Sequence, residues 1–291
     1  MISKRMIQKC KTCDYERNAP DGICLLKKTS DGLILRCVGG WSKDKYYYLR
    51  RYLEIFTTSM REKWKGQLYY LDLFAGPGKC RVRETEEEID ASPLIALNTR
   101  FPFAGYFFVE LNKESMNALK KRCDNHSLYD RIVFIEGDCN EKIDLVINEI
   151  PQRSLGLAFI DPTGLHFRFP TLEKLSQRKV DLIITFPLWM SIGRNLKKFL
   201  EQEASLLDLT IGDKGWRKCK TRREIVQYFR KKLETLNYVI VKSEEEREIS
   251  IRSTTKNLPL YCLLFASKHQ LGYKFWKKVG EMNHTGQRSL F

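Results

Sequence analysis

The chain has 291 residues, of which 43% are hydrophobic, enough to bury the core of one large α/β domain with small appendages. Lys and Arg number 51 against 36 Asp and Glu, and the formal net charge of +15 indicates a phosphate-rich partner such as nucleic acid, although a membrane surface or an acidic protein would respond to the same charge. No run of about 20 apolar residues occurs and the basic N-terminus has no apolar stretch after it, so we expect a cytoplasmic protein without a spanning helix or signal peptide.

Residues 1–40 contain two Asp-Gly turn signals between short apolar runs and are predicted to form a small strand-and-turn appendage to a domain spanning residues 41–291. This segment has too few apolar residues for a core of its own, and a metal would supply the missing stability. Four of the nine cysteines lie here, with one C-x2-C spacing, which predicts a zinc site and leaves free thiols or an iron–sulfur cluster as alternatives. They are Cys10, Cys13, Cys24 and Cys37.

The pattern of apolar residues predicts a helix over residues 44–64, followed by five strands that alternate with helical segments. The gaps between these runs are long enough for crossover helices, which indicates a parallel sheet. Two later runs lie close together and predict an antiparallel pair that closes the sheet. The five runs are residues 68–74, 106–109, 132–135, 157–160 and 182–186, and the pair is 238–241 and 260–265.

This order of strands predicts a Rossmann-like α/β fold of the class I methyltransferase type, with a mostly parallel seven-stranded sheet and helices on both faces. Between the two groups of strands, residues 191–236 are predicted to form a basic insertion. It consists of helices over 191–207 and 221–236 joined by a linker at 214–220.

An apolar strand at residues 69–74 ends in a glycine-rich turn. Gly76 and Gly78 carry no side chains, so the backbone there can come close to a ligand at the carboxyl end of the strand. The turn lacks a G-K-[ST] ending and a full G-x-G-x-x-G, which argues against a nucleoside triphosphate and, less strongly, a dinucleotide. The alternative is an ordinary turn between strand and helix. The predicted cofactor contacts here are Asp72, Phe74, Ala75, Gly76, Pro77 and Gly78.

Acidic residues follow the next two strands. Glu110 is placed to accept hydrogen bonds from both hydroxyls of a ribose, and Asp138 to accept one from an adenine amino group. The residues after them, Leu111 and Cys139, are predicted to line the same site. Each acid alone is equally well a solvated loop carboxylate. Together with the glycine turn at the same edge of the sheet, they predict a nucleoside-bearing cofactor.

Asp161, Pro162 and Thr163 follow the fourth strand and are the candidate catalytic residues. Asp161 is also counted among the cofactor contacts, because it would lie beside a methyl group awaiting transfer. Its carboxylate would hydrogen-bond the attacking amino group or hydroxyl and so orient its lone pair. The alternative is a proline turn with a capping aspartate.

A dense basic segment within the insertion is predicted to contact nucleic acid through phosphate pairing and stacking on a base, with a solvated basic helix face as the alternative. The predicted contacts are Lys214, Trp216, Arg217, Lys218, Lys220, Arg222 and Arg223.

Six short motifs resemble the three-Cys-motif partner protein family, from about residue 37 to the end of the chain. They are CVGGWSKDK at 37–45, DLFAGPG at 72–78, ASPL at 91–94, FVE at 108–110, IDPTGL at 160–165 and LFASKH at 264–269. The resemblance implies a class I methyltransferase fold, S-adenosylmethionine as cofactor and a separate protein partner with three clustered cysteines. It adds Trp41 and Lys45 to the predicted cofactor contacts.

The motif at 160–165 departs from that of DNA amino-methyltransferases, in which an aromatic residue after Asp/Asn-Pro-Pro stacks on the flipped base. Here Thr163 and Gly164 follow Pro162, which argues against methylation of an exocyclic amine.

Taken together, the motifs and the positive charge predict an S-adenosylmethionine-dependent methyltransferase of DNA or RNA. The alternatives are a methyltransferase of a small molecule or protein, and a catalytically silent nucleic-acid-binding or scaffolding protein of the same fold.

Overall fold

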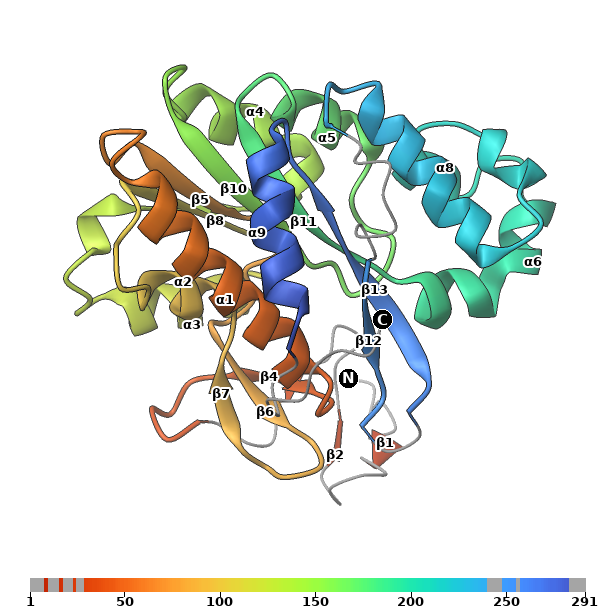
Figure 1. Ribbon diagram of the computed structural model, residues 1–291. Helices are drawn as coiled ribbons and strands as arrows, with labels where there is room; N and C mark the ends of the chain where they lie inside the picture. The colour runs from red at the N-terminus through yellow and green to blue at the C-terminus, as the bar shows by residue number, and fades with distance from the viewer. Residues whose placement is uncertain are drawn as a thin grey trace.

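The computed structural model describes residues 29–239, 248–254 and 257–282, together with the backbone of three two-residue strands nearer the N-terminus. Its main sheet has seven strands in the order β12-β13-β11-β10-β5-β8-β9 (Figure 1). Neighbouring strands are parallel except that β13 runs antiparallel to both β11 and β12. The strands are β5 (Leu68–Asp72), β8 (Gly105–Glu110), β9 (Ile132–Glu136), β10 (Leu155–Ile160), β11 (Val180–Phe186), β12 (Ile249–Arg252) and β13 (Pro259–Ala266).

This arrangement confirms the predicted α/β fold and its five parallel strands. The first strand of the predicted closing pair is wrong in position, because β12 occupies residues 249–252 and not 238–241. Tyr238 and Val239 are not in a strand, and residues 240 and 241 lie outside the described part of the chain. Tyr238 is 3% exposed, and the Val239 N–H donates to the Ser267 carbonyl at 2.9 Å. Tyr238 and Val239 therefore belong to a loop packed on the core, which the periodicity of apolar residues alone does not distinguish from a strand.

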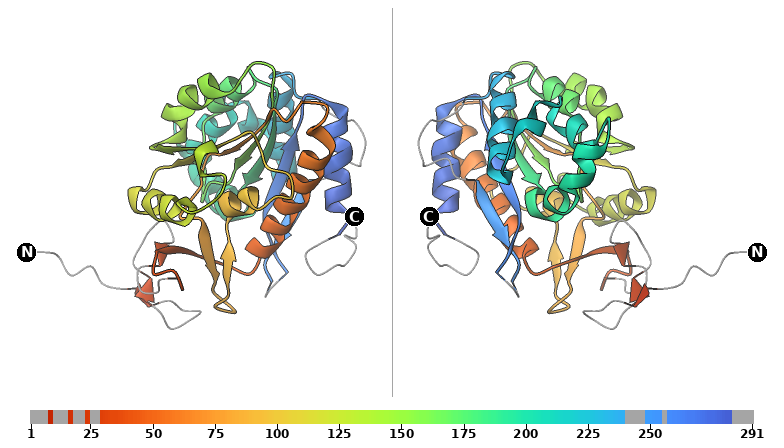
Figure 2. Two further views of the ribbon diagram at one scale, coloured as in Figure 1. Left: turned by 90° about the vertical axis from the view of Figure 1, so that its left-hand side faces the viewer. Right: turned by 90° about the vertical axis from the view of Figure 1, so that its right-hand side faces the viewer.

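Helices cover both faces of the sheet (Figure 2). One face packs against α1, α2, α3 and α9, and the other packs against α4 to α8. The strands alternate between the two layers, as in β10, where Leu157 and Phe159 face the first and Ala158 and Ile160 the second. The helices are α1 (Ser42–Met60), α2 (Ser92–Leu97), α3 (Lys113–Cys123), α4 (Cys139–Glu149), α5 (Phe169–Leu175), α6 (Gly193–Glu201), α7 (Leu206–Ile211), α8 (Arg222–Glu234) and α9 (Gln270–Gly280).

The predicted helix at 44–64 corresponds to α1, whose residues Tyr48, Tyr52 and Phe56 form part of its buried stripe. The predicted helix at 221–236 corresponds to α8. The predicted helix at 191–207 is divided into a π-helical turn (Leu188–Ile192), α6 and the start of α7. No helix in the described ranges is both long and apolar enough to cross a membrane.

A second, smaller sheet lies below the carboxyl edge of the main sheet in Figure 1, with the strand order β3-β4-β6-β7. The strands β3 (Ile23–Cys24) and β4 (Leu35–Val38) come from the predicted appendage, whereas β6 (Lys79–Val82) and β7 (Glu88–Asp90) are inserted between β5 and α2. Because β4 pairs in parallel with β6, residues 1–40 and the domain after them share this sheet. A separate antiparallel pair joins β1 (Gln8–Lys9) and β2 (Glu16–Arg17).

The predicted zinc site falls mostly outside the described residues. Cys10 and Cys13 are not among them, and only the backbone of Cys24 is described. Cys37 is half-buried on β4. In the ranges that the structure covers, no three His, Cys, Asp or Glu side chains are grouped to hold a metal. Zinc therefore stays a prediction.

Candidate functional site

Two adjoining cavities lie at the carboxyl ends of β5, β8, β9 and β10, where open α/β sheets bind ligands. The first cavity has a volume of about 670 Å³, and of the predicted cofactor contacts it is lined by Phe74, Glu110, Leu111, Asp138 and Cys139. The second cavity has a volume of about 350 Å³. Its lining includes the predicted residues Trp41, Lys45, Phe74, Ala75, Gly76, Pro77, Asp161, Pro162 and Thr163.

The two cavities share Phe74, Thr163 and Arg36 in their linings. The predicted cofactor residues that follow β8 and β9 and the predicted catalytic residues that follow β10 thus face neighbouring spaces. A molecule in the first cavity can therefore present a group to a molecule in the second.

The glycine-rich turn is shaped by Gly76, which has a φ of 64°. A Cβ added there would meet no atom within 4 Å, so the glycine is required by the backbone conformation. Gly78 differs, because it lines neither cavity and a Cβ added there would lie 2.9 Å from Leu119 Cδ1 on α3. The turn packs closely against α3 at this residue, and the predicted cofactor contact of Gly78 stays a prediction.

Glu110 joins the glycine turn to the end of β8. Its Oε2 accepts a hydrogen bond from the Gly76 N–H at 2.7 Å, and its Oε1 accepts one from the Asn112 N–H at 2.8 Å. The residue is only 7% exposed and lines the first cavity. A carboxylate has about four lone-pair sites, so each oxygen retains one for a ligand hydroxyl.

Asp138 caps the amino end of α4. Its Oδ1 accepts from the backbone N–H of Asn140 at 2.9 Å and from the Asn140 side-chain amide at 2.7 Å. Its Oδ2 has no hydrogen-bond partner among the described residues. The neighbouring Leu111 side chain is 71% exposed and lines the same cavity. An apolar surface and a free acceptor thus lie together, as an adenine ring with its amino group requires.

Asp72 lies beneath the glycine turn and lines neither cavity, and its predicted cofactor contact stays a prediction. It is fully buried. Its Oδ1 accepts from the Phe74 N–H at 3.3 Å, and the Tyr70 hydroxyl donates to its Oδ2 at 3.2 Å. Burial raises the pKa of this carboxyl to about 7, against the hydrogen bond from the Ser92 hydroxyl, which lowers it. Asp72 therefore fixes the turn from below.

Asp161 forms an ion pair in the second cavity with Lys45, which α1 supplies. The side chains of Lys45 and Asp161 are 9% and 15% exposed, respectively. Trp41 borders the same cavity, and the Arg83 guanidinium lies 5.1 Å from the centroid of the Trp41 ring. Trp41 and Lys45, predicted as cofactor contacts, thus line the second cavity and not the first.

Several residues of the second cavity were not predicted from the sequence, among them Arg36, Arg83, Thr185 and Tyr261. Arg36 and Arg83 come from the small sheet and its connections, which carried no motif. Thr185 carried a signal, since it is a hydroxyl residue within the otherwise apolar end of a buried strand.

The basic segment at 214–223 divides into buried and exposed residues. Trp216 is only 1% exposed, and its Nε1 donates to Asp208 Oδ1 at 2.8 Å. Arg217 forms an ion pair with Asp208 at 2.6 Å. The predicted stacking of Trp216 on a base is therefore wrong, because Asp208 satisfies the indole N–H and lets the ring enter the core. The exposed cations are Lys214, Lys218, Lys220, Arg222 and Arg223.

One of these exposed cations, Arg222, lies close to the wall of the second cavity. The Arg222 guanidinium packs against Gly193, the first residue of α6. The π-helical turn immediately before it contains Met190, which lines the second cavity. Only the π-helical turn thus separates the amino end of α8 from the second cavity.

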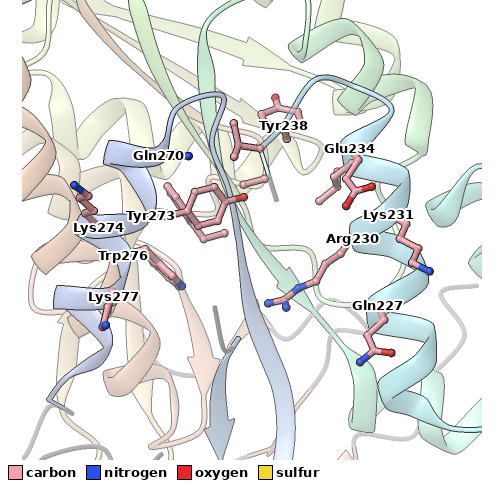
Figure 3. Close-up of a pocket in the computed structure, with 14 residues that line it drawn as sticks. Gln227, Arg230, Lys231, Glu234, Tyr238, Gln270, Tyr273, Lys274, Trp276 and Lys277 are labelled. Atoms are coloured by element: carbon pink, nitrogen blue, oxygen red, sulfur yellow. The ribbon is translucent and has the colours of Figure 1, made fainter. Parts of the chain in front are cut away.

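A third cavity, of about 440 Å³, lies between α8 and α9 (Figure 3). Tyr238, Trp276 and Lys231 are among the residues that line it, and Arg230 on its wall forms an ion pair with Glu248 at 3.2 Å. It contains none of the predicted cofactor or catalytic residues, so it is separate from the candidate site.

No family model and no curated protein matches this chain. The resemblance to the three-Cys-motif partner family therefore stays a prediction. Among solved structures, the chain is similar to a protein from Legionella pneumophila, with 11% identity and a TM-score of 0.49 over 82% of this chain and 91% of that one.

Two further similar structures carry names. One is the O-methyltransferase TomG from Streptomyces achromogenes in complex with SAM, with 9% identity and a TM-score of 0.42 over 76% of this chain and 79% of that one. The other is the methyltransferase domain of bacterial CtHen1, with 13% identity and a TM-score of 0.39 over 76% and 99%. The order of the strands and the single antiparallel strand define the class of fold, that of the Rossmann-like class I methyltransferases.

Proposed function

We propose that this protein is an S-adenosylmethionine-dependent methyltransferase that acts on nucleic acid. The observation that carries the proposal is the pair of cavities joined at Phe74 and Thr163, with Glu110 and Asp138 in the first and Asp161 in the second. A methyltransferase needs such a pair, one space for the methyl donor and one for the acceptor. We call the second cavity the acceptor cavity from here on.

The residues of the first cavity fit the cofactor. Glu110 retains acceptor sites for the two ribose hydroxyls, and Asp138 Oδ2 is free to accept from the adenine amino group. Leu111 and Cys139 offer apolar surface on which the adenine ring would lie.

The bound cofactor would supply a methyl carbon attached to a positively charged sulfur. The lone pair of the acceptor would bond to that carbon, and the electrons of the broken carbon–sulfur bond would stay on sulfur. Asp161 accepts a hydrogen bond from the attacking N–H or O–H, which aims the lone pair, and it takes up the proton that the acceptor loses. Lys45 holds the Asp161 carboxylate in place through their ion pair.

Charge favours nucleic acid as the acceptor. The chain carries a formal charge of +15, and the 214–223 segment has five exposed cations, of which Arg222 packs against Gly193, directly after the turn that contains the cavity residue Met190. Arg36 and Arg83 border that cavity from the small sheet. A small molecule or a protein is the alternative acceptor. A three-cysteine protein, implied by the family resemblance, is a further proposed partner.

Replacing Glu110 with alanine is expected to weaken S-adenosylmethionine binding by about 10- to 150-fold, the effect of losing hydrogen bonds to a charged group. Calorimetry with the purified protein measures this. Glu114 lies exposed on the first turn of α3, so Glu114→Ala is the matched control and should bind as the unmodified protein does. Unchanged affinity in Glu110→Ala would remove the carboxylate from the cofactor site.

Binding of nucleic acid is expected to weaken steeply with salt, because each phosphate contact contributes a slope of about 0.7 to 0.9 in log affinity against log salt concentration. Changing Lys218, Lys220, Arg222 and Arg223 to alanine should flatten that slope by about two to four units and leave cofactor affinity unchanged. Fluorescence anisotropy with labelled single-stranded RNA and DNA gives the slope.

A control variant removes the same charge at the opposite edge of the sheet. Lys63, Arg100, Arg153 and Lys179 are exposed and lie in the connections that lead into the strands. Their replacement by alanine should leave most of the slope intact. Equal slopes for the two variants would mean that the basic segment at 214–223 is only a solvated surface.

A further inference from the structure

Two buried hydroxyls of the acceptor cavity have no hydrogen-bond partner among the described residues. They are Thr185 Oγ1 and Tyr261 OH, on residues that are 4% and 5% exposed. Buried polar groups are nearly always satisfied, because an unpaired one loses its bonds to water without compensation. Two such groups lining one cavity indicate that a bound molecule forms the missing hydrogen bonds.

The sheet brings these hydroxyls to Asp161 and Lys45. Thr185 pairs with Leu263 across β11 and β13, and Tyr261 lies two residues from Leu263 on the same face. Ile160 pairs with Ile184 across β10 and β11, so the next residues along, Asp161 and Thr185, are neighbours. The helix α1 covers this face and supplies Lys45. Two hydroxyls, a carboxylate and an ammonium group thus line one small space.

The lining and the volume of the acceptor cavity restrict the kind of ligand that can bind there. Its polar groups include both donors and acceptors, and its apolar wall includes Trp41, Pro187 and Met190. Its volume of about 350 Å³ lies at the lower end of the range for ligand pockets, which excludes a nucleic-acid helix. A planar ring with polar atoms around its edge matches this combination of walls and hydrogen-bonding groups.

The charge of the lining distinguishes a nucleotide from a basic protein side chain. Arg36, Lys45 and Arg83 line the cavity, and Asp161 is the single acidic residue among its described lining residues. A lysine or arginine side chain would meet a surplus of positive charge there. A nucleotide would instead bring its own phosphates toward Arg36 and Arg83.

We propose that the acceptor cavity takes a single nucleobase, extruded from the strand, and that Thr185 and Tyr261 select it by hydrogen-bonding its polar edge. This inference rests on the proposed function and adds the part of the nucleic acid that is methylated. A base inside a duplex does not reach a cavity of this size, so the substrate is single-stranded or is flipped out of its helix.

The test uses Thr185→Val and Tyr261→Phe, which remove each hydroxyl and nearly keep its shape. The substrates are mixed-sequence single-stranded RNA and DNA, with methyl-labelled S-adenosylmethionine. Each variant is expected to lower kcat/KM by about 5- to 150-fold, the effect of leaving one hydrogen bond of a polar substrate unmade. Cofactor affinity measured by calorimetry should stay within about twofold, since neither residue lines the first cavity.

The matched control is Tyr238→Phe. The Tyr238 hydroxyl is likewise buried without a partner among the described residues, but it lines the cavity between α8 and α9 and not the acceptor cavity (Figure 3). Its removal should leave kcat/KM unchanged. Unchanged kcat/KM in both Thr185→Val and Tyr261→Phe would overturn the proposal.

The position of the label separates this inference from the proposed function. Digestion of the product to nucleosides followed by mass spectrometry should find the methyl group on a base. A methyl group on the ribose would overturn the extruded base and leave a nucleic-acid methyltransferase. Failure of the unmodified protein to bind S-adenosylmethionine would instead overturn the proposed function and the inference together.

Discussion

Asparagine in place of Asp161 is expected to lower the rate of methyl transfer by about 10²- to 10⁴-fold, the usual contribution of a positioned proton acceptor. The amide fills the same volume but does not take up the proton that the acceptor loses. Cofactor affinity should change little, because Asp161 lines the acceptor cavity and not the first cavity. Single-turnover transfer of a labelled methyl group measures the rate, and calorimetry measures the affinity.

Loss of folding has to be separated from loss of chemistry, because Asp161→Asn leaves the buried Lys45 ammonium group without its ion-pair partner. The double variant Asp161→Asn with Lys45→Met removes both charges and should recover stability in urea without recovering activity. The exposed ion pair Lys43–Glu87 provides a control. Glu87→Gln is expected to change the free energy of unfolding by no more than about 1 kcal/mol and to leave the rate of methyl transfer unchanged. Full activity in folded Asp161→Asn would remove this carboxylate from the reaction.

Asparagine in place of Asp72 is expected to make the protein more stable at pH 8 and to reduce the dependence of its stability on pH. Burial raises the pKa of Asp72 from 3.8 to about 7, so the folded chain holds a proton between those pH values that the unfolded chain has released. The free energy of unfolding therefore falls as pH rises through this window. About 2–3 kcal/mol of that loss lies between pH 5 and pH 8.

Urea unfolding at pH 5 and pH 8 tests this expectation. The difference in unfolding free energy between the two pH values should shrink by about 2–3 kcal/mol in Asp72→Asn. Burial also raises the pKa of Asp181, to about 6, so Asp181→Asn should shrink the difference by a smaller amount in the same direction. An unaltered pH dependence in Asp72→Asn would mean that this carboxyl titrates normally in the folded protein.

The central sheet was predictable because each of its five parallel strands is a short apolar run bounded by polar turns. Burial on both faces requires such runs, as β11 shows with seven buried residues in succession. β12 was not predictable in the same way. It is a four-residue edge strand with two exposed positions, so the more apolar run at 238–241 competed with it in the sequence.

The acids of the site were predictable because parallel strands end at one edge, which brings Glu110, Asp138 and Asp161 together whatever the details of packing. The hydroxyls of Thr185 and Tyr261 meet only through the antiparallel pairing of β11 with β13, which local sequence does not encode. Trp216 was mispredicted for a similar reason. Its burial depends on a hydrogen bond to Asp208, eight residues earlier in the chain.

The most direct test of the proposed function is transfer of a labelled methyl group from S-adenosylmethionine by the purified protein to separate pools of DNA, RNA and protein. Label is expected in a nucleic-acid pool, with a large reduction in Glu110→Ala and in Asp161→Asn. Label in the protein pool alone, or none in any pool from a protein that binds the cofactor, would contradict the proposed function.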